Sequence, residues 1–283
     1  MESVQAIGEA PLRLGAFIGL FAVLALLELA LPRRMPGKGK SVRWFTNLMI
    51  AGIDTLVVRL MAMLAVPVAA VAAAAWAGTH GWGLLNAVGW PAWVEIPVAM
   101  IVLDLAIYGQ HVVSHKVPVL WRLHRVHHTD VDFDVTTAVR FHPVEIALSM
   151  LWKIVVVLAL GAAPWAVIFF EITLNGCAMF NHANLALPLW LDRLIRMVLV
   201  TPDMHRVHHS IYRAEYDTNF GFSLSVWDRL FRTYTAQPRD GHAGMTIGQK
   251  NHLNDNPKKL LWSLRLPFVR TRHATAQKKL KGK

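Results

Sequence analysis

Long apolar runs are the feature that most limits how this chain can fold. Residues 14–32 carry one charge, Glu28, and are long enough to cross a hydrocarbon core of about 30 Å as a helix. With 54% apolar and 17% charged residues, the chain is too apolar for an ordinary soluble domain. There are five such runs: 14–32, 48–77, 93–115, 143–160 and 164–182. The short turn at 161–164 predicts a helical hairpin from the last two, so we expect an all-α integral membrane helical bundle of about five spans.

The two loops that flank the second run differ in charge, and this difference predicts the orientation of the bundle. Positive loops stay in the cytoplasm. Residues 78–92 carry no Lys, Arg, Asp or Glu, whereas the segment before the second run contains five basic residues: Arg33, Arg34, Lys38, Lys40 and Arg43. We therefore expect a multi-pass protein whose active-site face and C-terminus are cytoplasmic. Beyond the spans, the short apolar segment 187–200 is typical of a helix in the membrane interface.

Histidine is unusually abundant, with 14 copies, and most of the copies are clustered. The third run ends in His111-Val-Val-Ser-His115, and His-Arg-Val-His-His occurs twice, at 124–128 and 205–209. Spacings of three and four place rings on one face of a helix. His142, which directly precedes the fourth run, is a further candidate ligand. We expect a cytoplasmic histidine-rich helical cap with nine principal candidates for catalysis and metal binding: His111, His115, His124, His127, His128, His182, His205, His208 and His209.

Metal coordination is the interpretation that best accounts for so many clustered imidazoles. Unpaired rings packed together are costly to bury, and two ions with four or five imidazoles each fit the number of candidates. Imidazole alone does not distinguish iron, zinc, copper and nickel. Taken singly, His142 and His182 also fit a structural role at a helix end, whereas haem would use only one or two of the nine rings. The single cysteine, Cys177, excludes a four-cysteine iron–sulfur cluster carried by this chain alone.

An ordered set of motifs resembles the fatty acid hydroxylase/sterol desaturase superfamily of integral-membrane, non-haem di-iron enzymes. The resemblance implies that the nine histidines hold two irons that activate dioxygen. Some members have a histidine pair where this chain has only His182, which leaves Asn184, His142 or water to complete that site. The motifs are Arg43-Trp-Phe-Thr-Asn47, Asp104-x-x-x-Tyr108, His111 to His115, Leu120-Trp-Arg-Leu-His-Arg-Val-His-His128, Arg140-Phe-His-Pro-Val-Glu145, Asn181-His-Ala-Asn184, His205 to His209 and Trp227-Asp-Arg-Leu-Phe231.

Helical periodicity predicts residues that hydrogen-bond to the ligand histidines and orient them. Asp104 and Tyr108 precede His111 and His115 by seven residues and share their helix face. Asp104 would then accept the spare ring N–H of a ligand and fix its tautomer. Glu171 falls on the His182 face of the last run by the same counting. For each of these residues a structural polar contact between helices is the alternative.

The sequence predicts a membrane-bound, O2-dependent oxidoreductase that hydroxylates or desaturates a fatty acyl, sterol-like or other isoprenoid lipid. Two iron ions would be its cofactors and dioxygen its co-substrate. The lipid would enter from the bilayer, and electrons would come from a separate reductase, ferredoxin or cytochrome; no nucleic acid partner is expected. The alternative is a histidine-rich membrane protein that binds or transports metal without redox catalysis. The expected divisions are anchor spans in 1–92, a catalytic domain in 93–235 and a basic tail in 236–283.

Overall fold

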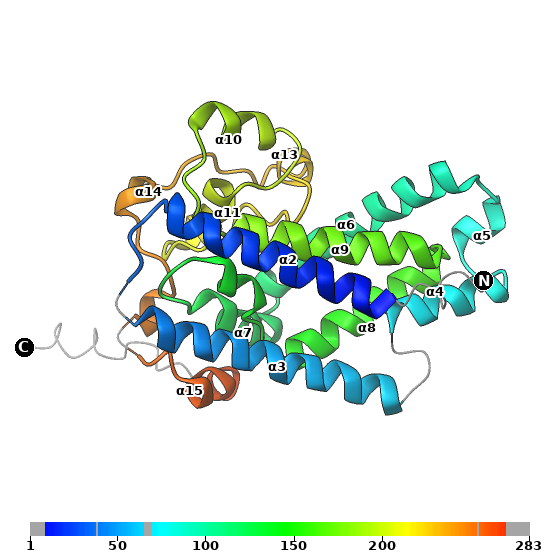
Figure 1. The fold of residues 1–283 in the computed structure, drawn as a ribbon, viewed down its shortest axis with the longest axis horizontal. Helices are drawn as coiled ribbons and strands as arrows, with labels where there is room; N and C mark the ends of the chain where they lie inside the picture. The colour runs from blue at the N-terminus through cyan, green and yellow to red at the C-terminus, as the bar shows by residue number, and fades with distance from the viewer. Residues whose placement is uncertain (1–8, 38, 65–68, 254, 270–283) are drawn as a thin grey trace, which may run out of the picture.

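A computed structural model describes residues 9–37, 39–64, 69–253 and 255–269. Among the described residues, four helices are long and apolar enough to cross a membrane: α2 (Glu9–Ala30), α3 (Lys40–Leu64), α6 (Ala92–Lys116) and α8 (Pro143–Leu160). These helices and α9 (Pro164–His182) form an elongated bundle (Figure 1). No strand longer than an isolated bridge occurs in the described ranges. The predicted all-α membrane bundle is confirmed.

The second and fifth apolar runs differ from their predicted form. The second is divided between α3, which begins at Lys40, and a shorter helix, α4 (Ala70–Thr79). The fifth, α9, is not among the four helices that qualify as spans. It packs against α2, α4 and α6 within the bundle. Because protein surrounds much of α9, this helix accommodates polar side chains that lipid would exclude.

A three-residue turn joins α8 to α9, as the sequence predicts, and glycine makes this turn possible. Gly161 ends α8 with a φ of 68°, in the left-handed region that favours glycine. A side chain at Gly161 would also meet the Trp82 carbonyl oxygen at 2.6 Å. That close approach docks the loop before α5 (Leu84–Val88) onto the turn. The two helices are consecutive, and each packs against α4 and α6.

Short helices form a cap at one end of the long helices (Figure 1). In α10, Leu189 and Trp190 are 65% and 68% exposed, whereas Asp192 and Arg196 are buried and paired at 2.6 Å. An apolar outer face of this kind suits the interfacial position predicted for 187–200. The cap comprises α7 (Pro118–His128), η1 (Val135–Val139), α10 (Leu189–Ile195), α11 (Pro202–His208), α12 (Arg213–Tyr216), α13 (Val226–Leu230), α14 (Gly241–Gly244), η2 (Lys250–His252), α15 (Leu260–Arg265) and η3 (Leu266–Phe268).

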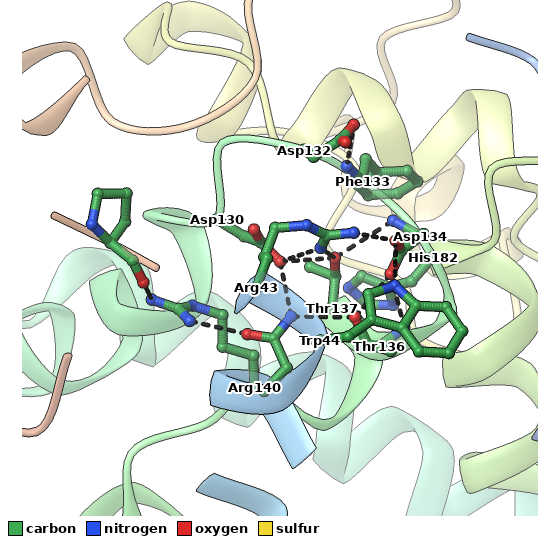
Figure 2. A network of polar contacts seen from close by, with 12 residues as sticks. Arg43, Trp44, Asp130, Asp132, Phe133, Asp134, Thr136, Thr137, Arg140 and His182 are labelled. Atoms are coloured by element: carbon green, nitrogen blue, oxygen red, sulfur yellow. Dashed lines mark hydrogen bonds and ion pairs between the residues drawn. The ribbon is translucent and has the colours of Figure 1, made fainter. Parts of the chain in front are cut away.

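A buried polar network fixes the segment after α7 against α3 (Figure 2). Arg43 donates to Asp130 at 2.7 Å and also to Asp134, and all three side chains are at most 5% exposed. Asn47, one turn further along α3, donates to Asp130 at 3.0 Å and accepts from Arg140 at 2.8 Å. Arg140 also donates to the Val126 carbonyl oxygen inside α7 at 2.9 Å. The network therefore holds the histidine-bearing helix in register with α3.

The C-terminal segment up to residue 269 contacts this network. Arg140 donates to the carbonyl oxygen of Pro257 and to the Ser263 hydroxyl, each at 2.8 Å. The division into 1–92, 93–235 and 236–283 stays a prediction. Lys38 and the basic residues after 269 lie outside the described residues.

Candidate metal centre

The structure brings all nine predicted histidines together in two adjacent groups. Within each group, one ring nitrogen per residue lies within 4.8 Å of every other. All nine side chains are buried, between 0% and 7% exposed. We call the first set, His111, His115, His124, His128 and His208, the five-histidine group, and the second set, His127, His182, His205 and His209, the four-histidine group.

Each His-x-x-His-His motif divides its rings between the two groups. On α7, His124 and His128 lie one turn apart and join the five-histidine group, while His127 joins the other. The motif at 205–209 does the reverse, since His205 and His209 join the four-histidine group. Residues four apart share a helix face, whereas the histidine directly before the second of them points to a different side. Each motif therefore contributes to both groups.

Within the groups, ring nitrogens face one another at short distances. His124 Nε2 lies 3.1 Å from His111 Nε2 and 3.2 Å from His128 Nε2. His182 Nε2 lies 3.1 Å from the Nε2 atoms of both His127 and His205. Ligand nitrogens about 2.1 Å from one ion and at right angles to each other would lie about 3.0 Å apart. The observed spacings match that geometry.

The outer nitrogens of four rings fix their tautomers. A carbonyl oxygen only accepts, so an Nδ1 atom beside one carries the proton, and the Nε2 of the neutral ring presents a lone pair. His124 Nδ1 lies 2.6 Å from Glu145 Oε1, which fixes the same tautomer. Three rings donate Nδ1–H to backbone carbonyl oxygens: His111 to Phe220 at 2.7 Å, His208 to Thr218 at 2.6 Å and His182 to Ala178 at 2.7 Å.

The inward lone pairs require a partner. The Nε2 atoms of His111 and His124 both present lone pairs, yet they face each other at 3.1 Å. His208 Nε2 and both ring nitrogens of His209 are buried without a hydrogen-bond partner in the described part of the chain. A cation at the centre of each group would satisfy these atoms, and imidazole nitrogen suits iron, copper, zinc and nickel. The donor set therefore fits two metal ions.

Burial keeps the cap histidines in the form that binds metal. It holds the pKa of His127, His128 and His205 well below the ordinary value of 6.5, and neighbouring histidines lower it further. Burial likewise lowers the pKa of His208 to about 3, although its hydrogen bond to the Thr218 carbonyl opposes this shift. These rings are neutral at pH 7, and a neutral imidazole has the free lone pair that a metal needs.

The expected role of Asp104 as the partner of a ligand ring is wrong. Its Oδ2 accepts from the Trp227 ring N–H at 2.8 Å and from the Leu224 backbone N–H at 3.2 Å. Tyr108 contacts the Thr233 hydroxyl at 2.9 Å. Helical periodicity placed Asp104 and Tyr108 on the correct face of α6. Which groups these two side chains contact depends on the segment that packs across this face. Both residues join α6 to the chain around α13.

Three other predicted site residues also have structural partners outside both groups. Glu171 pairs with cations from α2 and α8. Asn184 contacts the backbone of Arg34, donating to its carbonyl oxygen at 2.7 Å. His142 caps the start of α8, and its Nε2 lies 3.1 Å from the Leu264 carbonyl oxygen. The structure therefore places neither Asn184 nor His142 within the four-histidine group.

Two features of the site were missed in the sequence. Glu145 contacts His124. The sequence contained a signal for a functional acid here, because Glu145 lies in the first turn of α8, after Pro143. The second feature is a tight turn at Asn219, whose φ of 53° lies in the left-handed region that asparagine tolerates. This turn directs the carbonyl oxygens of Thr218 and Phe220 onto two rings of the five-histidine group.

A cavity of about 310 Å³ lies beside the five-histidine group. Residues from α2, α3, α6, α8 and α9 form its wall, and His111, His124 and Glu145 are part of that wall. Ile107, Phe141 and several other apolar side chains line it as well. An apolar chain in this cavity would contact the five-histidine group directly.

Comparison with known proteins supports the assignment made from the motifs. The chain is 26% identical to ornithine lipid hydroxylase OlsE of Rhizobium tropici over 57% of its own length and 48% of that protein. It is 28% identical to human alkylglycerol monooxygenase over 52% of the chain and 32% of that protein. For rat cholesterol 25-hydroxylase the identity is 23%, over 51% of the chain and 48% of that protein. Each match spans about half of the relative's length or less. No solved structure matches the chain.

The profile of the fatty acid hydroxylase family matches residues 96–233. This range begins in α6 and ends after α13, so it contains all nine clustered histidines and the turn at Asn219. This profile match and the relatives named above together support the fatty acid hydroxylase superfamily as the family of this chain.

Proposed function

We propose that this chain is a membrane-bound, O2-dependent di-iron oxidoreductase that hydroxylates a lipid. One observation carries the proposal: buried imidazole lone pairs converge on two centres, and one of these centres borders a cavity among the membrane helices. The relatives named as lipid hydroxylases and monooxygenases favour insertion of oxygen over desaturation.

The nine histidines would hold the two irons, which supply dioxygen activation and removal of hydrogen from an unactivated C–H bond. The chain's own contribution is to position the ligands. Carbonyl oxygens and Glu145 bind the outer ring nitrogens, so that each Nε2 stays directed inward. Burial of all nine rings also keeps water away from the centre.

Substrate would reach the centre from the bilayer. The cavity lies among α2, α3, α6, α8 and α9, and its wall includes two rings of the five-histidine group. A lipid chain bound there would place one methylene beside those rings, because the surrounding helices restrict its path. The cap would face the cytoplasm, where a separate reductase, ferredoxin or cytochrome would deliver the electrons.

Lipid analysis tests this proposal. Membranes from cells with and without the expressed protein would be extracted and compared by mass spectrometry, and we expect a lipid that gains one oxygen atom. Loss of two hydrogens would indicate desaturation instead. His127→Ala and His208→Ala should abolish the product, while His80→Ala and His252→Ala should leave it unchanged, because these two rings lie outside both groups.

His242 is a poor control, although it lies outside the motifs. It is 6% exposed, and its Nε2 lies 3.6 Å from Asp203. Oxidation that survives both His127→Ala and His208→Ala would refute the proposal. If wild-type protein binds metal but oxidises no lipid with any electron donor, metal binding or transport becomes the better interpretation.

A further inference from the structure

Large apolar side chains are exposed together on α10, on α13 and just after α10. Two hydrogen bonds join these elements: the Ser225 N–H donates to the Val198 carbonyl oxygen at 2.9 Å, and the Arg229 side chain donates to the Arg196 carbonyl oxygen at 2.7 Å (Figure 1). A contiguous apolar surface of this kind marks contact with a partner or with a membrane. We call it the α10–α13 patch; its members are between 51% and 68% exposed and comprise Leu189, Trp190, Leu194, Met197, Leu230 and Phe231.

The patch lies where a membrane-spanning helix ends. The apolar span in α2 extends to Ala30, and the chain directly after it pairs with the segment before α10. The Ala186 N–H donates to the Leu31 carbonyl oxygen at 2.9 Å, and α10 begins three residues later, at Leu189. Three residues extend over at most about 11 Å, so α10 begins close to the membrane surface. A lipid bilayer is therefore the contact that this position favours.

Arg193 of α10 lies among the exposed apolar side chains. At about 100° per residue, Leu189, Trp190 and Leu194 cover an arc of about 140° of the helix surface, and Arg193 falls inside this arc. Its side chain is exposed and has no hydrogen-bond or ion-pair partner among the described residues. A long cationic side chain in an apolar interfacial face extends its charge to the lipid headgroups. Arg193 is thus placed to meet a headgroup.

A cavity of about 460 Å³ adjoins the patch, and its wall is positively charged. Arg193, Arg196 and Arg229 line it against a single acid, Asp192, so three positive charges and one negative charge give a net charge of +2. Arg196 pairs with Asp192 at 2.6 Å, which leaves the charges of Arg193 and Arg229 for a ligand. Asp228 is not part of the wall; it is buried, and its oxygens accept backbone N–H groups. The wall favours an anion.

We propose that the α10–α13 patch lies in the membrane interface and that Arg193 and Arg229 bind the phosphate of an anionic phospholipid. The apolar side chains contact the acyl chains, and guanidinium groups match the geometry of a phosphate. A zwitterionic headgroup would bring a further cation to a positive wall, so an anionic lipid binds better. None of the residues of this site lines the cavity beside the five-histidine group. The bound lipid holds the cap against the bilayer, and it is not the substrate.

Native mass spectrometry of the purified full chain tests the headgroup site. The chain would be titrated separately with dioleoylphosphatidylglycerol, which is anionic, and with dioleoylphosphatidylcholine, which is zwitterionic. A basic residue near a membrane surface contributes about fivefold to the binding of anionic lipid. With two arginines in the site, we expect phosphatidylglycerol to bind at least about tenfold more tightly than phosphatidylcholine.

Three variants and a control isolate the arginines. Arg193→Leu should reduce the preference by about fivefold, whereas Arg193→Lys should keep most of it because lysine preserves the charge. The double variant Arg193→Leu/Arg229→Gln should lose it, although glutamine can still donate to the Arg196 carbonyl oxygen. Lys250→Leu removes a charge from an exposed position of the cap outside this cavity and should behave as wild type. Unchanged metal content in all four proteins would verify that they fold.

Fluorescence quenching locates the patch relative to the bilayer. Each variant would carry Cys177→Ser, so that the introduced cysteine alone binds a bimane label. Labels at Trp190→Cys and Phe231→Cys should be quenched by phosphatidylcholine that carries a nitroxide on its acyl chain. A label at Asp240→Cys, an exposed position before α14, should not be quenched. One chain per nanodisc keeps a second copy away from the patch.

Equal binding of the two phospholipids, or a preference that survives the double variant, would overturn the headgroup site. Labels at positions 190 and 231 that escape quenching would show that the patch faces water or a protein, and this result would overturn the membrane contact. Neither readout requires lipid oxidation. Failure of this inference is therefore distinguishable from failure of the proposed function.

Discussion

The five-histidine and four-histidine groups are built from the same motifs but are supported differently. In the five-histidine group, His111, His124 and His208 each have an outer nitrogen bound to a carbonyl or carboxylate oxygen. In the four-histidine group, His182 has such a bond to a carbonyl oxygen, whereas the outer nitrogens of His127 and His205 have no partner among the described residues. His115 and His128 of the five-histidine group lack such a bond as well. Aromatic packing contacts both groups, and in the four-histidine group it accompanies the single bond of His182.

Two phenylalanine rings provide that packing. Phe141 stacks on His127 with centroids 4.5 Å apart and planes 7° apart, and Phe133 stacks on His182 at 5.5 Å. Of the two groups, only the five-histidine group lines the cavity. The group that would contact substrate therefore has more directional bonds, on three of its five rings against one of four, whereas the other relies more on packing and on the network around Arg43.

The largest effect should come from Arg43→Leu, which acts mainly on the four-histidine group. The substitution leaves Asp130 and Asp134 buried without their cation, and such a loss costs about 3–5 kcal/mol. Phe133, next to Asp134, would lose its fixed position against His182. We expect a large fall in melting temperature and loss of metal. The exposed Arg193→Leu is the matched control and should change stability by no more than about 0.5 kcal/mol.

Glu145→Leu should weaken the five-histidine group while leaving the other intact. It removes the carboxylate 2.6 Å from His124 Nδ1, and loss of such a partner reduces metal affinity or activity by about 10- to 100-fold. Glu145→Gln keeps an acceptor and should recover part of the loss. Metal titration and lipid oxidation measure the effect. Equal activity of the Leu variant and wild type would show that Glu145 does not position His124.

Asn219→Ala should have the smallest effect on metal binding, and this effect again falls on the five-histidine group. Alanine at a φ of 53° costs about 1–2 kcal/mol. The change also removes the Asn219 side-chain bonds to Met204 and Thr235. Asn219→Gly also loses these side-chain bonds, but glycine adopts the positive φ without strain. The melting temperature of Asn219→Gly should therefore lie between those of Asn219→Ala and wild type. A Gly variant as unstable as the Ala variant would contradict the backbone contribution.

The sequence predicted the histidine clusters because the rings of each cluster are only a few residues apart in the chain. Spacings of three and four determine which rings share a helix face, so the clusters followed from helix geometry alone. The division into two groups depends on where α7 and α11 lie relative to each other, and this is a property of tertiary packing. The partners of His111 and His208 are backbone atoms of a turn about 110 and 10 residues away. No side-chain pattern encodes them.

Intramembrane charge was harder to interpret than histidine. Glu28 and Asp54 both interrupt apolar runs, yet only the structure separates their roles. Glu28 accepts from the backbone N–H groups of Val135 and Asn184 at 2.7 and 2.8 Å, which is a structural role. Asp54 borders the cavity with an unpartnered oxygen. Periodicity could not separate the two, because it does not reveal which groups other helices present.

The most direct test of the two-centre account is the iron content of the purified chain after anaerobic reconstitution with ferrous iron. Wild-type protein should bind two irons per chain. His182→Ala and His111→Ala should each bind about one, because each removes a ligand from a different group. Wild-type protein that binds one iron or none, or single variants that both retain two, would contradict the assignment of one metal to each histidine group.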